Sequence, residues 1–163
     1  MGDWMKTTPI VAGLSLMISL LVLFGIVYIL VAPTPGSTTP AGDPDKEFEI
    51  TGGEIGDMFG FGDSSIIISP GPELQVNKGD LVKVTFRNVG EIPHTFRITN
   101  EKVWDAEPVF GAFVGQPMRP LEPGQVGMTF FIAEEEGTFY YICTVPGHVD
   151  RGMFGTIQVG PSD

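Results

Sequence analysis

The segment from Ile10 to Ala32 contains no charged residue and is almost entirely apolar. A helix of this length rises about 34 Å, enough to cross a hydrocarbon core of about 30 Å. We therefore expect residues 10–32 to form a transmembrane helix that serves as an uncleaved signal anchor. A cleaved secretory signal is the first alternative, but Leu30 and Pro33 do not suit a cleavage site. A buried core helix is the second alternative. Because this helix would be apolar on every side, other parts of the protein would have to cover it completely.

The flanks of this segment indicate its orientation. Residues 1–9 carry Lys6 and the α-amino group, whereas no Lys or Arg follows the segment before Lys46. The positive-inside rule therefore places the N-terminus in the cytoplasm and the rest of the chain outside the cell membrane, in the periplasm or extracellular space. Residues 33–45 are rich in Pro, Thr and Gly, so we expect a linker that keeps the outer domain near the membrane.

Residues 46–163 are expected to form one folded domain. The chain has 22 Gly and 14 Pro, a content that is natural for a turn-rich β protein and too high for a helical bundle. Short segments alternate apolar and polar residues between turn residues, as Val82, Val84 and Phe86 do on one face of an expected strand. The clearest strand candidates lie at 65–69, 82–87, 94–98, 125–132, 138–142 and 154–159. They predict an all-β fold, an antiparallel Greek-key sandwich or barrel.

The residues that could carry chemistry are few and regularly placed. Cys143, His148 and Met153 recur at intervals of five residues, and the other histidine, His94, follows Pro93 in a distant segment. Taken singly, each would be an ordinary core or surface residue. Together, one thiolate, two imidazoles and a thioether are the donor set of a mononuclear blue-copper site. Thiolate and thioether favour Cu(I), and imidazole accepts both Cu(I) and Cu(II), so we expect one type 1 copper ion.

Residues 47–159 resemble the cupredoxin family of small blue-copper proteins. The resemblance lies in the Cys-x4-His-x4-Met loop, which is most similar to that of auracyanin and rusticyanin, and in the strand that leads into Cys143. It implies a trigonal set of copper ligands with a long axial ligand. The implied trigonal ligands are His94, Cys143 and His148, and the implied axial ligand is Met153. Pro93, Thr95 and Thr144 are expected beside them, and Thr95 replaces the Asn of many members, so the hydrogen bonds around the copper should differ.

The resemblance implies a protein that carries single electrons between redox partners, and the predicted anchor and its orientation place it at the outer face of the membrane. It implies no enzyme activity, because four protein ligands leave no open position for a substrate. In the family, electrons usually pass through the imidazole edge that corresponds to His148, within an apolar patch. Candidates for that patch are Pro146, Phe110, Phe113 and Met118, although the two Phe side chains could instead fill the core. The alternative function is copper storage or delivery, or a copper-binding accessory subunit of a membrane redox complex.

Residue counts exclude several related sites. A binuclear copper centre needs two Cys, and multicopper oxidases and copper nitrite reductases need more His for a second kind of copper, whereas this chain has 1 Cys and 2 His. Structural zinc prefers more Cys or His and rarely binds Met. The formal net charge of −11 excludes nucleic-acid binding through counterion release. Acidic residues such as Glu134, Glu135 and Glu136 either keep the domain soluble or steer a redox partner with a basic docking surface.

Overall fold

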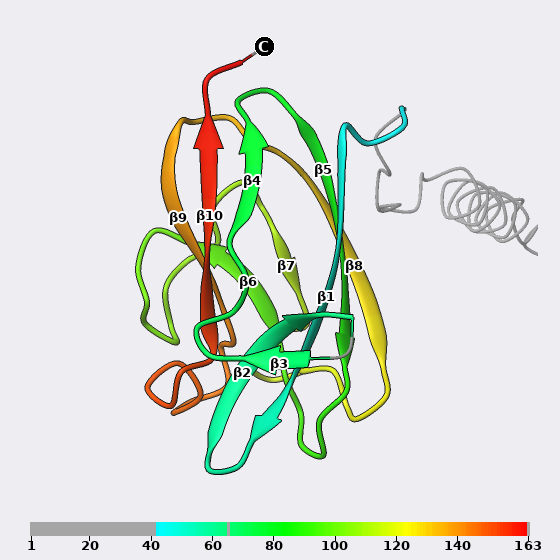
Figure 1. Ribbon diagram of the computed structural model, residues 1–163, viewed down its shortest axis with the longest axis vertical. Coiled ribbons are helices and arrows are strands. Elements are labelled where there is room, and N and C mark those ends of the chain that lie inside the picture. The colour runs from blue at the N-terminus through cyan, green and yellow to red at the C-terminus, as the bar shows by residue number, and fades with distance from the viewer. Residues whose placement is uncertain (1–41, 65, 163) are drawn as a thin grey trace, which may run out of the picture. The chain divides into compact units, whose positions relative to one another are not determined.

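The computed structural model describes residues 42–64 and 66–162. Every regular element in these ranges is a strand, and ten strands form two five-stranded sheets packed as a sandwich (Figure 1). The first sheet has the order β3 (Ile66–Ile68), β2 (Met58–Asp63), β1 (Lys46–Ile55), β5 (Leu81–Asn88) and β8 (Val126–Ile132). The second has the order β4 (Leu74–Asn77), β10 (Phe154–Gly160), β9 (Gly137–Ile142), β6 (Phe96–Thr99) and β7 (Phe113–Val114). The predicted all-β class is confirmed for this part of the chain.

Alternation of apolar and polar residues forms the strands as expected. In β5, Val82, Val84 and Phe86 are fully buried, while Lys83 and Thr85 between them are half-buried on the outer face. The buried faces of the two sheets meet in one apolar core. Its largest fully buried aromatic side chains are Tyr141, Phe61, Phe86 and Phe96.

The sheets are less uniform than the prediction of an antiparallel fold. Strand β1 pairs in parallel with β5, and β4 pairs in parallel with β10, while the other pairs are antiparallel. Strands β1 and β2 were not predicted from the sequence, because glycines interrupt the alternation of apolar and polar side chains there. In β2, the glycines lie very close to the backbone of β3. A Cβ on Gly60 would overlap the carbonyl of Ile68, and a Cβ on Gly62 would overlap the carbonyl of Ile66.

The direction of β9 places the acidic triplet and Cys143 at opposite ends of the sandwich. Strand β9 starts after the exposed residues Glu134, Glu135 and Glu136 and ends just before Cys143. Its six residues span about 20 Å. The acidic triplet therefore lies at the end of the sandwich away from the cysteine, and in Figure 1 the triplet's turn is near the top, whereas the connection from β9 to β10 is near the bottom.

The predicted anchor at 10–32, the flank at 1–9 and most of the linker at 33–45 lie outside the described residues. Among the residues that the structure describes, no helix is long and apolar enough to cross a membrane.

Candidate metal centre

The loop that follows β9 is folded by hydrogen bonds between its own backbone groups. The N–H of Cys143 donates to the carbonyl of Met153 (3.2 Å), and the N–H of Met153 donates to the carbonyl of His148 (3.0 Å). Gly147 and Gly152 have φ angles of 83° and 99°, a conformation that favours glycine. The five-residue spacing thus keeps Cys143 and His148 together at the end of β9, with Met153 directly before β10.

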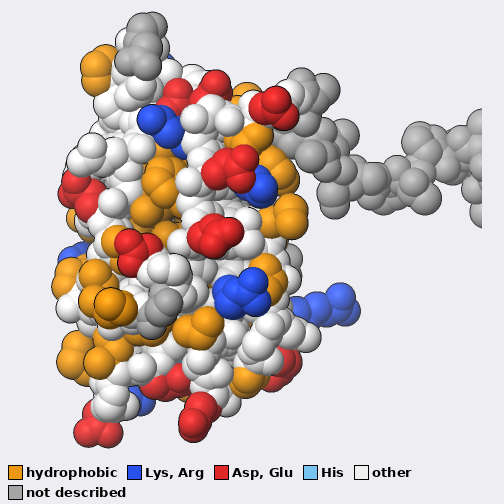
Figure 2. All heavy atoms as spheres, turned by 45° about the vertical axis from the view of Figure 1, so that its right-hand side comes forward, with side chains coloured by type: hydrophobic (Ala, Val, Ile, Leu, Met, Phe, Trp, Pro, Cys, Tyr) orange, Lys and Arg blue, Asp and Glu red, His pale blue; other side chains and the backbone are white. Residues whose placement is uncertain are grey.

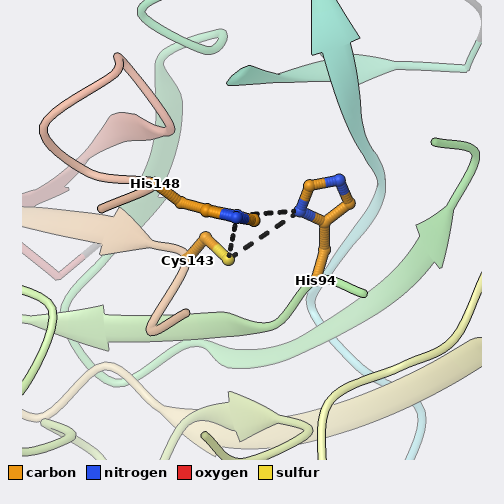
Figure 3. A group of neighbouring side chains, drawn as sticks. All are labelled: His94, Cys143 and His148. Atoms are coloured by element: carbon orange, nitrogen blue, oxygen red, sulfur yellow. Dashed lines mark hydrogen bonds between the residues drawn. The ribbon is translucent and has the colours of Figure 1, made fainter. Parts of the chain in front are cut away.

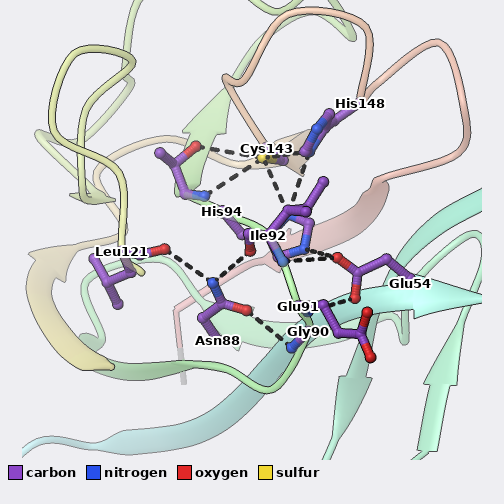
Figure 4. Close-up of polar contacts among 10 residues, drawn as sticks. Glu54, Asn88, Gly90, Glu91, Ile92, His94, Leu121, Cys143 and His148 are labelled. Carbon is purple, nitrogen blue, oxygen red and sulfur yellow. Dashed lines mark hydrogen bonds and ion pairs between the residues drawn. The ribbon is translucent and has the colours of Figure 1, made fainter. Parts of the chain in front are cut away.

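His94 is held in the connection between β5 and β6. It forms an isolated bridge with Leu121, in which the N–H of each donates to the carbonyl of the other at 3.0 and 2.9 Å. The buried amide of Asn88 donates to the carbonyls of Ile92 and Leu121 at 2.8 and 2.9 Å, and it accepts a bond from the N–H of Gly90 (Figure 4). Asn88, which the sequence reading missed, therefore ties the His94 loop to the Leu121 segment.

Three donor atoms from these two regions converge. The Nδ1 atoms of His94 and His148 lie 3.2 Å apart, and the Sγ of Cys143 lies 3.5 Å from the Nδ1 of His148 and 4.0 Å from that of His94 (Figure 3). All three side chains are buried. A point equidistant from the three atoms is about 2.1 Å from each, which matches the ~2.0–2.3 Å of imidazole and thiolate bonds to zinc, a metal of similar size. The donor set therefore fits one metal ion.

The protonation of these groups follows from their burial. Burial lowers the pKa of His148 to about 4, with help from the nearby His94 and Arg151. Burial also lowers the pKa of His94, although the carboxylate of Glu54 opposes the shift. Both imidazoles are therefore neutral near pH 7 and ready to bind a metal. Burial raises the pKa of the Cys143 thiol, which hydrogen bonds from Thr95 and Val145 only partly offset, so metal binding must release the thiol proton.

Thr95 and Thr144 lie directly beside the sulfur. The N–H of Thr95 points to the Sγ of Cys143 at 3.4 Å, and its Oγ1 lies 3.7 Å from the same sulfur. The Oγ1 of Thr95 also accepts a bond from the N–H of Thr144 (2.7 Å) and lies 2.8 Å from the hydroxyl of Thr144. When Thr144 donates to Thr95, the Thr95 hydroxyl hydrogen is left for the sulfur. Pro93, the third expected neighbour, is half-buried directly before His94.

Glu54, at the end of β1, faces the other side of the His94 ring. Its Oε1 lies 3.3 Å from the Nε2 of His94, although the angle is too poor for a regular hydrogen bond. The carboxylate accepts bonds from the N–H groups of Glu91 (2.9 Å) and Ile92 (3.2 Å) (Figure 4). Partial burial raises the pKa of Glu54, but these bonds, and the attraction to the His94 ring when it is protonated, outweigh it, so the net pKa is lowered. Glu54 was not predicted from the sequence as part of the site.

Phe59, in β2, covers the face of His148. The two rings are stacked with centroids 4.1 Å apart, and the guanidinium of Arg151 lies over Phe59 at 4.4 Å. Arg151 is held by bonds to the carbonyl of Asp57. This column of three side chains fixes the orientation of the His148 ring and was not predicted from the sequence.

The structure separates the residues expected at the electron port. Met118 is 91% exposed and lies in the loop that Leu121 joins to His94, and Pro146 is exposed two residues before His148. Phe113 is exposed in β7. Phe110 instead packs against Phe131 and Phe139, with ring centroids 5.9 and 4.9 Å apart, so it contributes to the core as the alternative reading expected.

Met153, the expected axial ligand, is fully buried. Its methyl group lies against Gly52 of β1, where any Cβ would overlap it and the Phe86 ring. The thioether is thus held between the core and the end of the loop that carries Cys143 and His148.

Comparison with known proteins identifies the family. Residues 68–163 match the family model described as multicopper oxidase, and the chain belongs to this family. The match includes His94, Cys143 and His148, and the family and the donor set together identify copper as the cofactor, as predicted from the sequence.

Two curated relatives have similar sequences. Rusticyanin of Acidithiobacillus ferrooxidans is 38% identical over 93 residues, which are 54% of this chain and 50% of the rusticyanin. The copper-containing nitrite reductase of Alcaligenes xylosoxydans xylosoxydans is 35% identical over 100 residues, 58% of this chain and 28% of the reductase. The chain thus spans between about a quarter and a half of the length of these relatives.

A solved structure shows the same fold. Reduced auracyanin from Roseiflexus castenholzii superposes with a TM-score of 0.55 and 22% identity, over 73% of this chain and 100% of the auracyanin. The described domain therefore has the fold of the cupredoxins, as the sequence resemblance implied.

Proposed function

We propose that this protein is a membrane-anchored blue-copper protein that transfers single electrons between redox partners on the outer face of the membrane. In this proposal His94, Cys143 and His148 bind one copper ion, and Met153 is a weak axial ligand. The observation that carries it is the convergence of one thiol and two neutral imidazoles, all buried, on one point. The uncharged segment at 10–32 and its flanking charges support the anchor and its orientation.

Copper, when bound, supplies the one-electron Cu(II)/Cu(I) couple. The chain's own residues keep the two imidazoles neutral and hold all three donors buried and fixed in place. The backbone bonds of the Cys143–Met153 loop and the Asn88 bonds hold the two ligand segments, and the Thr95 N–H donates to the sulfur. A site held in this way needs little rearrangement when an electron arrives or leaves.

We propose that the protein is not an enzyme, although several relatives are. Both histidines of the chain lie in the one cluster, so no imidazole is left for a second kind of copper. A ligand set completed by Met153 leaves no open position for a substrate. Copper storage or delivery is less well supported, because a buried site exchanges its metal slowly.

A redox titration tests the proposed function. The full-length protein in detergent is loaded with copper and followed by visible absorption while its potential is changed. We expect an intense blue thiolate-to-Cu(II) band that disappears and returns with the transfer of one electron. A colourless copper-loaded protein, or one that cannot be reoxidised reversibly, would contradict the proposal.

The port for electrons is proposed at the His148 edge, beside the exposed Pro146. Charges near it belong to Asp57, Asp150 and Arg151, which is stacked over Phe59. The acidic triplet Glu134–Glu136 lies about 20 Å away along β9, beyond the Debye length of about 8 Å at physiological salt. Figure 2 shows that, on the visible face, Asp and Glu side chains are scattered among Lys and Arg and do not form one continuous acidic patch. We therefore assign any steering of a basic partner to the net charge and to the acids near the port.

Salt should slow reduction of the oxidised protein by a cationic complex such as hexaammineruthenium(II). Raising the ionic strength from about 0.01 to about 0.15 M shortens the Debye length from about 30 to about 8 Å, and we expect the second-order rate constant to fall roughly tenfold. The Asp57→Asn/Asp150→Asn variant should lower the rate at low salt by more than a variant with Gln at 134, 135 and 136. Stopped-flow absorption measures both. If neither the ionic strength nor the substitutions changed the rate constant, charge would not guide docking, and the acidic surface would serve solubility instead.

A further inference from the structure

Glu54 connects β1 to the loop that carries His94. It stands at the end of β1, accepts backbone bonds from Glu91 and Ile92 in the loop that carries His94, and lies 3.3 Å from the Nε2 of His94. The side chain of Glu54 is 25% exposed, whereas that of His94 is fully buried. The carboxylate thus separates the inner ligand ring from solvent.

The His94 ring has only one polar atom besides the one aimed at the metal. Its Nδ1 faces Cys143 and His148, so a neutral ring that binds a metal there carries its hydrogen on Nε2. That buried Nε2 has no hydrogen-bond partner of regular geometry in the described part of the chain. The nearest acceptor is the Glu54 carboxylate, and a small shift of either side chain makes the bond.

The chain leaves room for this carboxylate. A Cβ placed on Gly90 would overlap both oxygens of Glu54, and Gly90 does not have the positive φ that would by itself favour glycine. Gly90 leaves the space that the Glu54 carboxylate occupies, and a Cβ at this position would displace the end of that flexible side chain.

We propose that Glu54 is a positioning residue of the copper centre, which orients His94 with Nδ1 toward the metal and makes the reduction potential lower than a neutral side chain would. This inference rests on the proposed copper function. With one thiolate, the site has a net charge of +1 as Cu(II) and of 0 as Cu(I). A carboxylate beside a ligand ring therefore stabilises the oxidised form more than the reduced form. Partial exposure screens this effect but does not remove it.

The test compares Glu54→Gln with Glu91→Gln in the full-length, copper-loaded protein. Gln keeps the size of Glu54 and an oxygen that can accept from the loop, but it removes the charge. Glu91→Gln removes a charge of the same sign from the loop that carries His94. Among the interactions of the described residues, the Glu91 side chain makes no contact with His94. Loss of a residue that supports a ligand typically costs about 10–100-fold in metal affinity. We expect Glu54→Gln to lower the ratio of Cu(II) to Cu(I) affinity about tenfold, a rise in potential of about 59 mV.

Two further variants separate positioning from general stability. Gly90→Ala keeps the carboxylate but displaces it, so it should raise the potential in the same direction as Glu54→Gln. Glu54→Asp keeps the charge on a shorter side chain and should restore part of the wild-type potential. Unfolding of each copper-free variant in urea reports any general loss of stability, which would not by itself move the potential.

The outcomes are distinct. A wild-type protein without the blue band refutes the proposed function and, with it, this inference. A blue wild type whose potential is the same in Glu54→Gln and Glu91→Gln refutes the role of Glu54 alone. A potential that rises in Glu54→Gln and Gly90→Ala, and not in Glu91→Gln, supports it.

Discussion

The Cys143→Ser variant should lose the blue band completely and bind copper far more weakly. Serine replaces the soft thiolate with a hard hydroxyl that does not ionise near neutral pH, so no sulfur-to-copper charge transfer remains. The drop in Cu(II) affinity should exceed the ~10–100-fold that loss of a supporting residue costs. Visible absorption and a competition titration with a copper chelator measure the two effects. The fold should survive, because the Thr95 N–H that faces the sulfur can donate equally well to a hydroxyl.

Met153→Leu is the control for this experiment. Leucine fills the same buried space beside Gly52 but cannot donate to copper. If Met153 is a weak axial ligand, this variant keeps the blue colour and has a raised potential, because a donor to Cu(II) has been lost. A Met153→Leu protein that binds no copper would show that the thioether is a main ligand. A Cys143→Ser protein that stays blue would show that the Cys143 sulfur is not a ligand of the copper.

The cluster of donors could be predicted from the sequence because its chemistry is concentrated in rare residues. With one Cys and two His in the chain, a site that needs a thiolate and two imidazoles has no other assignment. The loop from Cys143 to Met153 is also local, and its glycines indicate the turns that fold it back. The neighbours Thr95 and Thr144 follow two of the ligands directly in the sequence, so their place near the sulfur comes with the ligands.

The supporting residues could not be predicted, because they reach the site through strand pairing. Glu54 and Phe59 lie in β1 and β2, whose glycines hide the strand pattern, and the β1–β2 hairpin reaches the ligands only in the folded sandwich. A glutamate near the end of a strand resembles a solvated residue until its neighbours are known. Asn88 likewise ends an ordinary strand, and only its bonds to Ile92 and Leu121 reveal its role. Each depends on contacts distant in sequence, which periodicity does not contain.

The acidic run at 134–136 shows the same limit for surface charge. The sequence identifies the run but not the end of the sandwich where it lies. Because β9 runs from this turn to Cys143, the triplet and the metal centre are at opposite ends of one strand. The charges that matter for docking at His148 are then single residues, such as Asp57 and Asp150, which no charge run marks.

The copper-free protein should lose stability as the pH falls from about 7.5 to about 5. The pKa of His148 is lowered to about 4 in the folded protein, against about 6.5 in an unfolded chain. Between these values the unfolded state binds more protons than the folded state, so the free energy of unfolding decreases as the pH falls. His148 alone should remove about 2 kcal/mol over this range, and the lowered pKa of His94 adds to the loss in the same direction.

Urea unfolding of the copper-free protein at several pH values measures this loss, and the range stops near pH 5 so that most carboxylates stay ionised. A His148→Gln variant is the control, because it cannot take up the proton and should lose most of the pH dependence while keeping the sandwich folded. Copper should oppose the acid effect, since it binds only the neutral imidazoles and the thiolate and so adds stability to the folded state alone. If the wild-type protein and His148→Gln lost stability in parallel, the histidine would be protonated in the folded state without cost. The view that burial keeps His148 neutral and ready for the metal would then be wrong.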